Sequence, residues 1–213
     1  MKKIIFWDND GVLVNTEKYY YQANKETLAE LDIELDEKTF AEISLIKGES
    51  VFNLALEKGY SREDYQSLLS KRNYIYKKLL VDNNCLMPGI EKILIELSER
   101  FEMAIVTSSR NENFYALHKK TDLLKYFKFV LVREDYKNSK PAPEPYLLAL
   151  EKSGYSKNEA IIIEDTDRGL EAALSAGIDC IVYPNHYLKD SKFEGAKHII
   201  SELSELLELD CFN

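Results

Sequence analysis

The hydrophobic residues of this chain gather in short, uninterrupted runs. Three runs are rich in β-branched or aromatic residues and end at polar residues: KIIFW (3–7), MAIVT (103–107) and AIIIE (160–164). Two weaker runs are FVLVR (129–133) and CIVYP (180–184). Strands that are buried on both faces of a parallel sheet give such continuous runs. The pattern therefore predicts five strands of a buried parallel sheet.

Segments with helical patterns lie between these runs. They include residues 90–100, 111–117, 145–153 and 168–176. Strands that alternate with helices at this spacing are typical of βαβ units. We therefore expect an α/β fold in which helices connect parallel strands.

The stretch from residue 15 to residue 86 breaks this alternation. It contains helix-like segments at 17–31, 36–43, 50–58 and 61–80, and no convincing strand. Pro88 and Gly89 mark the return to the α/β pattern. We therefore predict a Rossmann-like parallel-sheet core formed by residues 1–14 and 87–213, with an inserted all-helical cap domain at 15–86.

Composition narrows the class of protein. The 213 residues are 45% hydrophobic, which is enough for one sizeable core, and the net charge of −9 argues against sequence-independent nucleic-acid binding. The three cysteines are odd in number and lack metal-ligand spacing, so we expect reduced thiols. No signal-peptide core or membrane-length apolar run is visible. We expect a soluble, cytoplasmic monomer that binds neither nucleic acid nor membranes.

Polar side chains follow the predicted strands. Ligands of an open parallel sheet bind beyond the carboxyl ends of its strands, so these residues should meet. They are Asp8-Asn9-Asp10-Gly11, Thr107-Ser108-Ser109-Arg110, Lys140-Pro141 and Glu164-Asp165. Four carboxylates close together need a cation, and an all-oxygen set suits Mg²⁺ better than zinc. The hydroxyl, ammonium and amide groups of the same set suit a phosphoryl group.

These residues resemble the four motifs of the haloacid dehalogenase-like hydrolase superfamily. The motifs are DNDGVL (8–13), VTSS (106–109), the lysine of SKPAPEPY (139–146) and IIIEDTDRGLEAALSAG (161–177). The helical segment after the first motif resembles the small helical cap of the β-phosphoglucomutase-like branch. The order and spacing of the motifs match over the whole chain.

The resemblance implies a role for each residue of the core motifs. Asp8 would be the nucleophile that forms an aspartyl-phosphate intermediate, and Asp10 would be the general acid and base. Asp8, the main-chain carbonyl of Asp10 and Asp165 would bind Mg²⁺, with Glu164 as a ligand directly or through water.

The resemblance also implies a phosphate-binding set. Thr107, Lys140 and the Ser108 amide would hold the transferred phosphoryl group, with Ser109 beside them. Gly11 would let the chain turn sharply next to the phosphate. In the cap, the candidates for substrate binding are Tyr20, Lys47, Glu49 and Arg72.

The second aspartate of the first motif separates the possible reactions. Asp10 favours phosphate-ester chemistry, because dehalogenase and phosphonatase branches usually lack it. A β-phosphoglucomutase has an arginine after the Gly-x-Ser of its cap, where this chain has Val51. The mutase family's cap histidine and its aspartate before Ser/Thr are replaced here by Tyr20 and Asn15. We therefore predict a phosphatase of a small phosphorylated metabolite such as a sugar phosphate.

Several alternatives stay open at this point. The chain could be a β-phosphoglucomutase-like phosphomutase, because Lys47 or Arg72 could contact a second phosphate, or it could be a non-catalytic phosphometabolite-binding module. Asp8 and Asp10 could belong to a calcium loop, although the residues that follow do not fit the EF-hand pattern. Lys140 alone could be a solvated lysine, and Thr107 with Ser108 could cap a helix. His118, His186 and His198 are expected in surface or structural roles.

Overall fold

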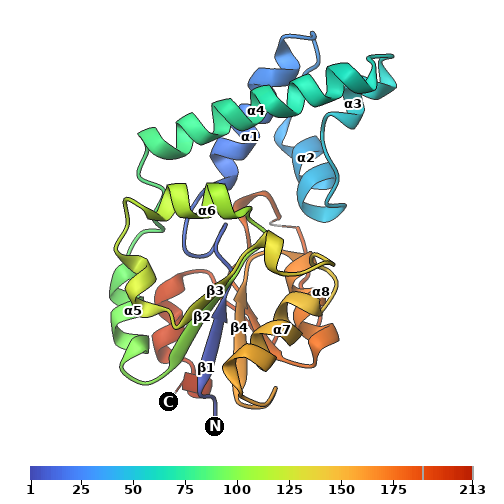
Figure 1. The fold of residues 1–213 in the computed structure, drawn as a ribbon. Coiled ribbons are helices and arrows are strands. Elements are labelled where there is room, and N and C mark those ends of the chain that lie inside the picture. The colour runs from blue at the N-terminus through green and yellow to red at the C-terminus, as the bar shows by residue number, and fades with distance from the viewer. Residues whose placement is uncertain (189, 213) are drawn as a thin grey trace. The chain divides into compact units, whose positions relative to one another are not determined.

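The computed structural model describes residues 1–188 and 190–212. These residues divide into two compact units, one formed by Met1–Asn15 with Leu86–Asn213 and the other by Thr16–Cys85. The first unit contains all the strands of the described chain, and the second contains helices (Figure 1). The predicted α/β fold with an all-helical insertion is therefore confirmed.

The first unit is built on a six-stranded sheet with the order β3-β2-β1-β4-β5-β6. Its strands are β1 (Ile4–Trp7), β2 (Glu102–Val106), β3 (Phe129–Leu131), β4 (Ala160–Glu164), β5 (Asp179–Val182) and β6 (His198–Ile199). Every neighbouring pair is parallel. The first five strands agree with the predicted runs to within one or two residues. The sixth is too short to produce a hydrophobic run, and sequence analysis missed it.

The sheet is buried at its centre, as the continuous hydrophobic runs predict. All residues of β1 and β4 are buried. The helices of this unit are α5 (Ile90–Ser98), α6 (Asn111–His118), α7 (Glu144–Ser153) and α8 (Asp167–Ala176). Figure 1 shows α5 on one side of the sheet and α7 with α8 on the other. Central strands covered on both faces have no polar-facing side, which explains why they do not alternate.

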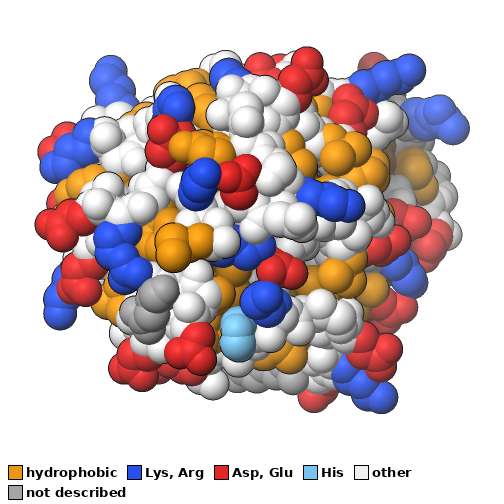
Figure 2. Space-filling view, turned by 90° about the horizontal axis from the view of Figure 1, so that it is seen from below, with side chains coloured by type: hydrophobic (Ala, Val, Ile, Leu, Met, Phe, Trp, Pro, Cys, Tyr) orange, Lys and Arg blue, Asp and Glu red, His pale blue; other side chains and the backbone are white. Residues whose placement is uncertain are grey.

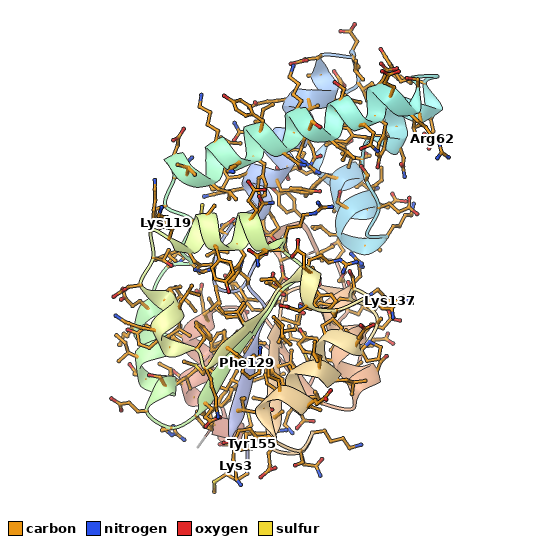
Figure 3. All side chains as sticks on the ribbon, viewed as in Figure 1. Lys3, Arg62, Lys119, Phe129, Lys137 and Tyr155 are labelled. Atoms are coloured by element: carbon orange, nitrogen blue, oxygen red, sulfur yellow. The ribbon has the colours of Figure 1, made fainter. Side chains whose placement is uncertain are left out.

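Short 3-10 helices complete the first unit. They span Leu123–Tyr126, Arg133–Asp135, His186–Leu188, Leu203–Glu208 and Asp210–Phe212. Figure 3 labels Lys3 and Tyr155 at the end of the unit where β1 and β4 begin, and Lys119 and Lys137 toward the opposite end. The polar residues that follow β1, β2 and β4 belong to that opposite end of the sheet.

The second unit consists of helices only. They are α1 (Glu17–Ala29), α2 (Glu37–Phe40), a π-helix (Ala41–Ile46), α3 (Asn53–Glu57) and α4 (Arg62–Asp82). The predicted helix at 36–43 is therefore an α-helical turn that continues as a π-helix, and the one at 50–58 is shorter than expected. Helix α4 starts at a capping box in which Ser61 and Asp64 satisfy each other's backbone amides.

The surface and the cysteines add two observations. None of the helices in the described part of the chain combines the length and apolar character that crossing a membrane requires. The face shown in Figure 2 carries acidic and basic side chains intermingled with hydrophobic ones, without a continuous basic patch. None of the three cysteines forms a disulfide, and Cys85 and Cys180 are buried.

Candidate active site

The ends of β1, β2 and β4 bring the predicted core residues together. Asp8 directly follows β1, and its backbone amide donates to the Ile163 carbonyl of β4 at 2.9 Å. Thr107 directly follows β2, whereas Glu164 is the last residue of β4. All three of these side chains are buried. A parallel register places strand ends side by side, which is why residues distant in sequence converge here.

Lys140 is the cation at the centre of this group. Its ammonium nitrogen lies 2.5 Å from Asp8 Oδ1 and 2.7 Å from Glu164 Oε1, and it also donates to the Val106 carbonyl at 2.9 Å. The side chain is only 7% exposed. Charge-assisted hydrogen bonds in so dry a place are short and strong. Lys140 is therefore not the solvated lysine that the sequence alone left as an alternative.

Burial and neighbouring charges shift the pKa values of this ion pair. Burial, together with the carboxylates of Glu164 and Asp10, raises the pKa of Asp8 to about 8, although Lys140 opposes the shift. Burial alone would lower the pKa of Lys140, but Asp8 and Glu164 outweigh that effect and raise it. Lys140 is therefore charged at neutral pH, while Asp8 needs further positive charge nearby to be fully ionised.

Glu164 is fixed by neighbours on several sides. Its Oε1 accepts from the Tyr146 hydroxyl at 2.5 Å as well as from Lys140, and its Oε2 accepts from the Asp165 amide at 3.2 Å. Gly169, in the first turns of α8, packs against the carboxylate. A Cβ atom at residue 169 would lie 1.9 Å from Glu164 Cδ and 2.0 Å from Oε2. Only glycine leaves room for the carboxylate in this position.

Substituting Gly169 by Ala is therefore expected to lower activity by about 10- to 100-fold, because the new methyl group displaces the carboxylate that holds Lys140. Alanine at an ordinary helix position would instead stabilise α8 by up to about 1 kcal/mol. Steady-state activity assays measure the first effect, and urea unfolding measures the change in stability. Ser175→Ala, at an exposed position of the same helix, is the control and should leave both unchanged. A Gly169→Ala protein with full activity would contradict the proposed packing constraint.

Three carboxylates of this site could bind a metal ion. Asp8, Glu164 and Asp165 are all buried, and each offers an oxygen within 4.8 Å of the others. Hard oxygen donors of this kind suit Mg²⁺. Lys140 supplies one positive charge against three negative ones, so a divalent cation fits the remaining charge. The donor set and its charge thus fit the predicted Mg²⁺ better than they would fit a softer metal.

Asn185 and Gly11 determine the position of the Asp165 carboxylate. Asn185 Nδ2 donates to Asp165 Oδ2 at 2.7 Å. Gly11 has a φ of +84°, and a Cβ atom there would lie 1.9 Å from Asp165 Oδ2. The loop after β1 can therefore approach Asp165 only because residue 11 lacks a side chain.

The Asp10 side chain is held by a different set of groups. Its Oδ2 accepts hydrogen bonds from Ser109 Oγ at 2.7 Å, from Asn9 Nδ2 at 3.2 Å and from Thr107 Oγ1 at 3.3 Å. Thr107 Oγ1 in turn accepts from the Ser109 amide at 2.9 Å. The two aspartates of the first motif therefore lie in separate environments, one paired with an ammonium group and one with neutral donors. Ser108, between Thr107 and Ser109, is exposed.

The four predicted cap residues belong to the helical unit. Lys47 and Glu49 are exposed, and Lys47 pairs with Glu42 at 2.8 Å. Arg72 is buried: its guanidinium carbon lies 4.5 Å from the centre of the Tyr20 ring. Arg72 thus packs directly against Tyr20, whereas Lys47 and Glu49 face solvent.

Sequence analysis gave no role to several residues that position the site. Tyr146, Asn185 and Asn9 contact Glu164, Asp165 and Asp10, respectively. Tyr146 lies within the predicted lysine motif, which was the available signal for it. Asn185 follows β5 by a few residues, and only the rule that ligand-binding residues follow strand ends could have indicated it.

Comparisons with known proteins identify the family of this chain. The family model described as haloacid dehalogenase-like hydrolase matches residues 4–183. A phosphorylated carbohydrates phosphatase of Thermotoga maritima is 32% identical over 197 residues, which cover 90% of this chain and 89% of the relative. A β-phosphoglucomutase of Bacillus subtilis is 27% identical, with 84% and 81% covered.

A solved structure shows the same fold over nearly the whole chain. It is a variant of CbbY from Rhodobacter sphaeroides in complex with xylulose-(1,5)-bisphosphate, and its TM-score with this chain is 0.81. The two chains are 25% identical, and the alignment covers 97% of this chain and 96% of the other.

Proposed function

The chain belongs to the haloacid dehalogenase-like hydrolase family, and from that membership we propose that it is a Mg²⁺-dependent phosphatase of small sugar phosphates. The observation that carries this proposal is the separation of Asp8 from Asp10. Asp8 lies 2.5 Å from the Lys140 ammonium, while Asp10 is hydrogen-bonded by Ser109, Asn9 and Thr107. Such separate environments suit two carboxyl groups with different roles, one beside the cation that would bind a phosphoryl group and one held apart from it by neutral side chains.

In the proposed reaction Asp8 attacks the phosphorus atom of the substrate. A carboxylate oxygen of Asp8 forms a bond to phosphorus, and the bond between phosphorus and the ester oxygen breaks. Lys140 and Thr107 neutralise and bind the phosphoryl oxygens during the transfer. Asp8, Glu164, Asp165 and the Asp10 carbonyl would hold Mg²⁺, which supplies positive charge next to the phosphoryl group.

Asp10 acts as the general acid in the first half-reaction and as the general base in the second. Its carboxyl group gives a proton to the departing ester oxygen, so that an alcohol leaves. The resulting carboxylate then takes a proton from water as the water oxygen attacks the phosphorus of the aspartyl phosphate. Inorganic phosphate leaves, and both aspartates return to their starting states.

The helical unit is the part of the chain that we propose determines which substrate is bound. We infer that Tyr20, Lys47, Glu49 and Arg72 act there on the sugar part of the substrate, and that residues 15–86 act as the cap. Val51, at the place of the mutase arginine, is 1% exposed and apolar. It offers no charge for a second phosphate, which supports a phosphatase over the phosphomutase. One copy of the chain supplies every residue of this account, so a monomer is sufficient.

A panel of small phosphate esters tests this proposal. We expect phosphate release from one or more sugar phosphates with Mg²⁺ and none after EDTA treatment. The measurement is inorganic phosphate formed per enzyme over time, with p-nitrophenyl phosphate as a general substrate. Interconversion of β-glucose 1-phosphate and glucose 6-phosphate without phosphate release would favour the phosphomutase. Binding of esters without turnover would favour the non-catalytic module.

Mg²⁺ affinity is expected to increase as the pH is raised toward about 8, because burial raises the pKa of Asp8 to that value and its proton competes with the metal. Isothermal titration calorimetry in two buffers of different ionisation enthalpy would detect the proton released on binding. In Asp8→Asn, which has no such proton, the release at this pH should be reduced. An affinity that stays constant over this pH range in the wild type would contradict the assignment of Asp8 as a ligand.

A further inference from the structure

A chain of hydrogen bonds leads from helix α6 to Asp10. His118, at the end of α6, lies 2.7 Å from Asn9 through Nε2 and Oδ1, and 3.0 Å from Thr121 through Nδ1 and Oγ1. Asn9 Nδ2 in turn donates to Asp10 Oδ2 at 3.2 Å. His118 is 2% exposed and Asn9 is fully buried. The chain therefore runs through the interior of the α/β unit and ends on the proposed acid/base.

The direction of each hydrogen bond follows from the chemistry of the groups. Asn9 Oδ1 can only accept, so His118 Nε2 must carry the hydrogen. Burial lowers the pKa of His118 to about 4, so the ring is neutral and its Nδ1 is an acceptor. The Thr121 hydroxyl lies 3.0 Å from that nitrogen and 3.3 Å from the His118 carbonyl oxygen, and its one hydrogen goes to the nearer nitrogen, which otherwise has no hydrogen to share. The hydrogen bonds thus point in one direction, from Thr121 toward the Asp10 carboxyl group.

This direction fixes the orientation of the Asn9 amide. If the amide were flipped, its NH₂ group would face the N–H of His118, which is repulsive, and Asp10 would lose the N–H that Asn9 now donates to it. The ring of Phe114 packs on His118 with 4.4 Å between ring centres, which restricts rotation of the imidazole. His118 therefore keeps the donor side of Asn9 turned toward Asp10.

The groups that meet Asp10 determine how its carboxyl group is oriented. Ser109, Thr107 and Asn9 all donate to Oδ2. Three polar groups gathered on one oxygen restrict rotation of the carboxyl group and so fix the direction in which it faces. Orientation of this kind matters because proton transfer to a leaving group requires a properly placed acid.

We propose that His118 is a positioning residue which, through the Asn9 amide, orients the Asp10 carboxyl group to protonate the leaving oxygen of the substrate. This inference rests on the proposed phosphatase function. In the step concerned, an Asp8 oxygen binds phosphorus, the bond from phosphorus to the ester oxygen breaks, and that oxygen takes a proton from the Asp10 carboxyl group. His118 touches neither the substrate nor the phosphoryl group, and it stays neutral throughout.

The test compares esters whose leaving groups differ in their need for an acid. A sugar alkoxide must be protonated as it departs, whereas p-nitrophenolate is stable without a proton. The quantity to compare is kcat/KM, which covers the steps up to release of the alcohol and leaves out the later hydrolysis of the aspartyl phosphate. The variants are His118→Leu, which removes the donor, and His118→Gln, whose amide can place an N–H near the position of Nε2.

We expect His118→Leu to lower kcat/KM for the sugar phosphate about tenfold, a part of the roughly 10²–10⁴ that an oriented general acid contributes. The same variant should change kcat/KM for p-nitrophenyl phosphate less than twofold, and His118→Gln should recover most of the sugar-phosphate activity. Asn9→Leu is of similar size to Asn9 and breaks the chain at its next link, so it should show the same selective loss. Leu117→Ala, a buried neighbour on α6, is the control for loss of packing.

Two results would overturn the inference. The first is an equal loss on both esters in His118→Leu and Asn9→Leu, matching Leu117→Ala, which would indicate a merely structural histidine. The second is full activity of both variants on the sugar phosphate. If His118→Leu does not fold, Asn9→Leu and His118→Gln decide the question by the same comparison. Failure of the proposed function is distinguishable, because the wild-type protein would then release phosphate from neither ester.

Discussion

Asp8→Asn is expected to abolish phosphate release, with a fall in kcat on the order of 10⁴ or more, because the amide cannot act as the nucleophile. By contrast, we expect the substitution to raise the stability of the metal-free protein. Asp8 is buried near Glu164 and Asp10, and burial with these like charges raises its pKa to about 8. A carboxyl pKa that is higher in the folded than in the unfolded protein makes folding less favourable as the pH rises from about 4, the ordinary aspartate value, to about 8. The neutral amide removes this penalty, so Asp8→Asn without Mg²⁺ should lack the fall in the free energy of unfolding that this carboxyl group causes in the wild type between about pH 4 and about pH 8.

Steady-state kinetics and urea unfolding at several pH values measure both effects on one preparation. Asp122→Asn is a suitable control, since Asp122 is exposed and forms a surface ion pair with Lys125 at 2.8 Å. It should keep wild-type activity. A residual Asp8→Asn activity within tenfold of wild type would mean that another group attacks phosphorus. Loss of both activity and folding would mean that Asp8 is needed for the structure.

Lys140→Met is the second substitution with a large expected effect. Loss of a preorganised cation at the phosphoryl group typically costs about 10²–10³ in rate. Asp8 and Glu164 would also stay buried without the ammonium that pairs with both, at 2.5 and 2.7 Å. Breaking a buried ion pair from one side typically destabilises a protein by about 3–5 kcal/mol. We therefore expect lower activity and lower stability together, in contrast to Asp8→Asn.

Urea unfolding with EDTA and with Mg²⁺ shows how far a bound cation compensates for the missing ammonium charge. If Mg²⁺ binds Asp8, Glu164 and Asp165, it should stabilise Lys140→Met more than it stabilises the wild type, because it replaces the missing positive charge. Lys137→Met, at an exposed position of the same loop, is the control. A Lys140→Met protein as stable as the wild type in EDTA would contradict the electrostatic account of the site.

Much of the fold could be predicted because the central strands are buried on both faces. The runs at residues 3–7 and 160–164 correspond to β1 and β4, whose side chains are all buried. Strand β6 has two residues and one of them, Ile199, is 53% exposed, so it left no hydrophobic run. The π-helix at Ala41–Ile46 also escaped prediction, since its periodicity is close to that of an α-helix over so few residues.

The chemistry of the site was more visible in the sequence than the contacts that support it. Asp8 and Asp10 stand directly after a strand, and the order of the motifs indicated Lys140 and Glu164. Residue type and spacing carried that information. The contact between His118 and Asn9 spans 109 residues and joins a helix end to a loop. No local pattern encodes such a pair, and His118 alone looked like an ordinary structural histidine.

The most direct test of the account is to trap the covalent intermediate. The enzyme would be mixed with Mg²⁺ and its preferred sugar phosphate, quenched in acid within one turnover, and digested for peptide mass spectrometry. We predict that the peptide containing Asp8 gains the mass of one phosphoryl group, and that the corresponding peptide of Asp8→Asn does not. Phosphate release by the wild type with no such modification, or with a phosphoryl group on another residue, would contradict the proposed mechanism.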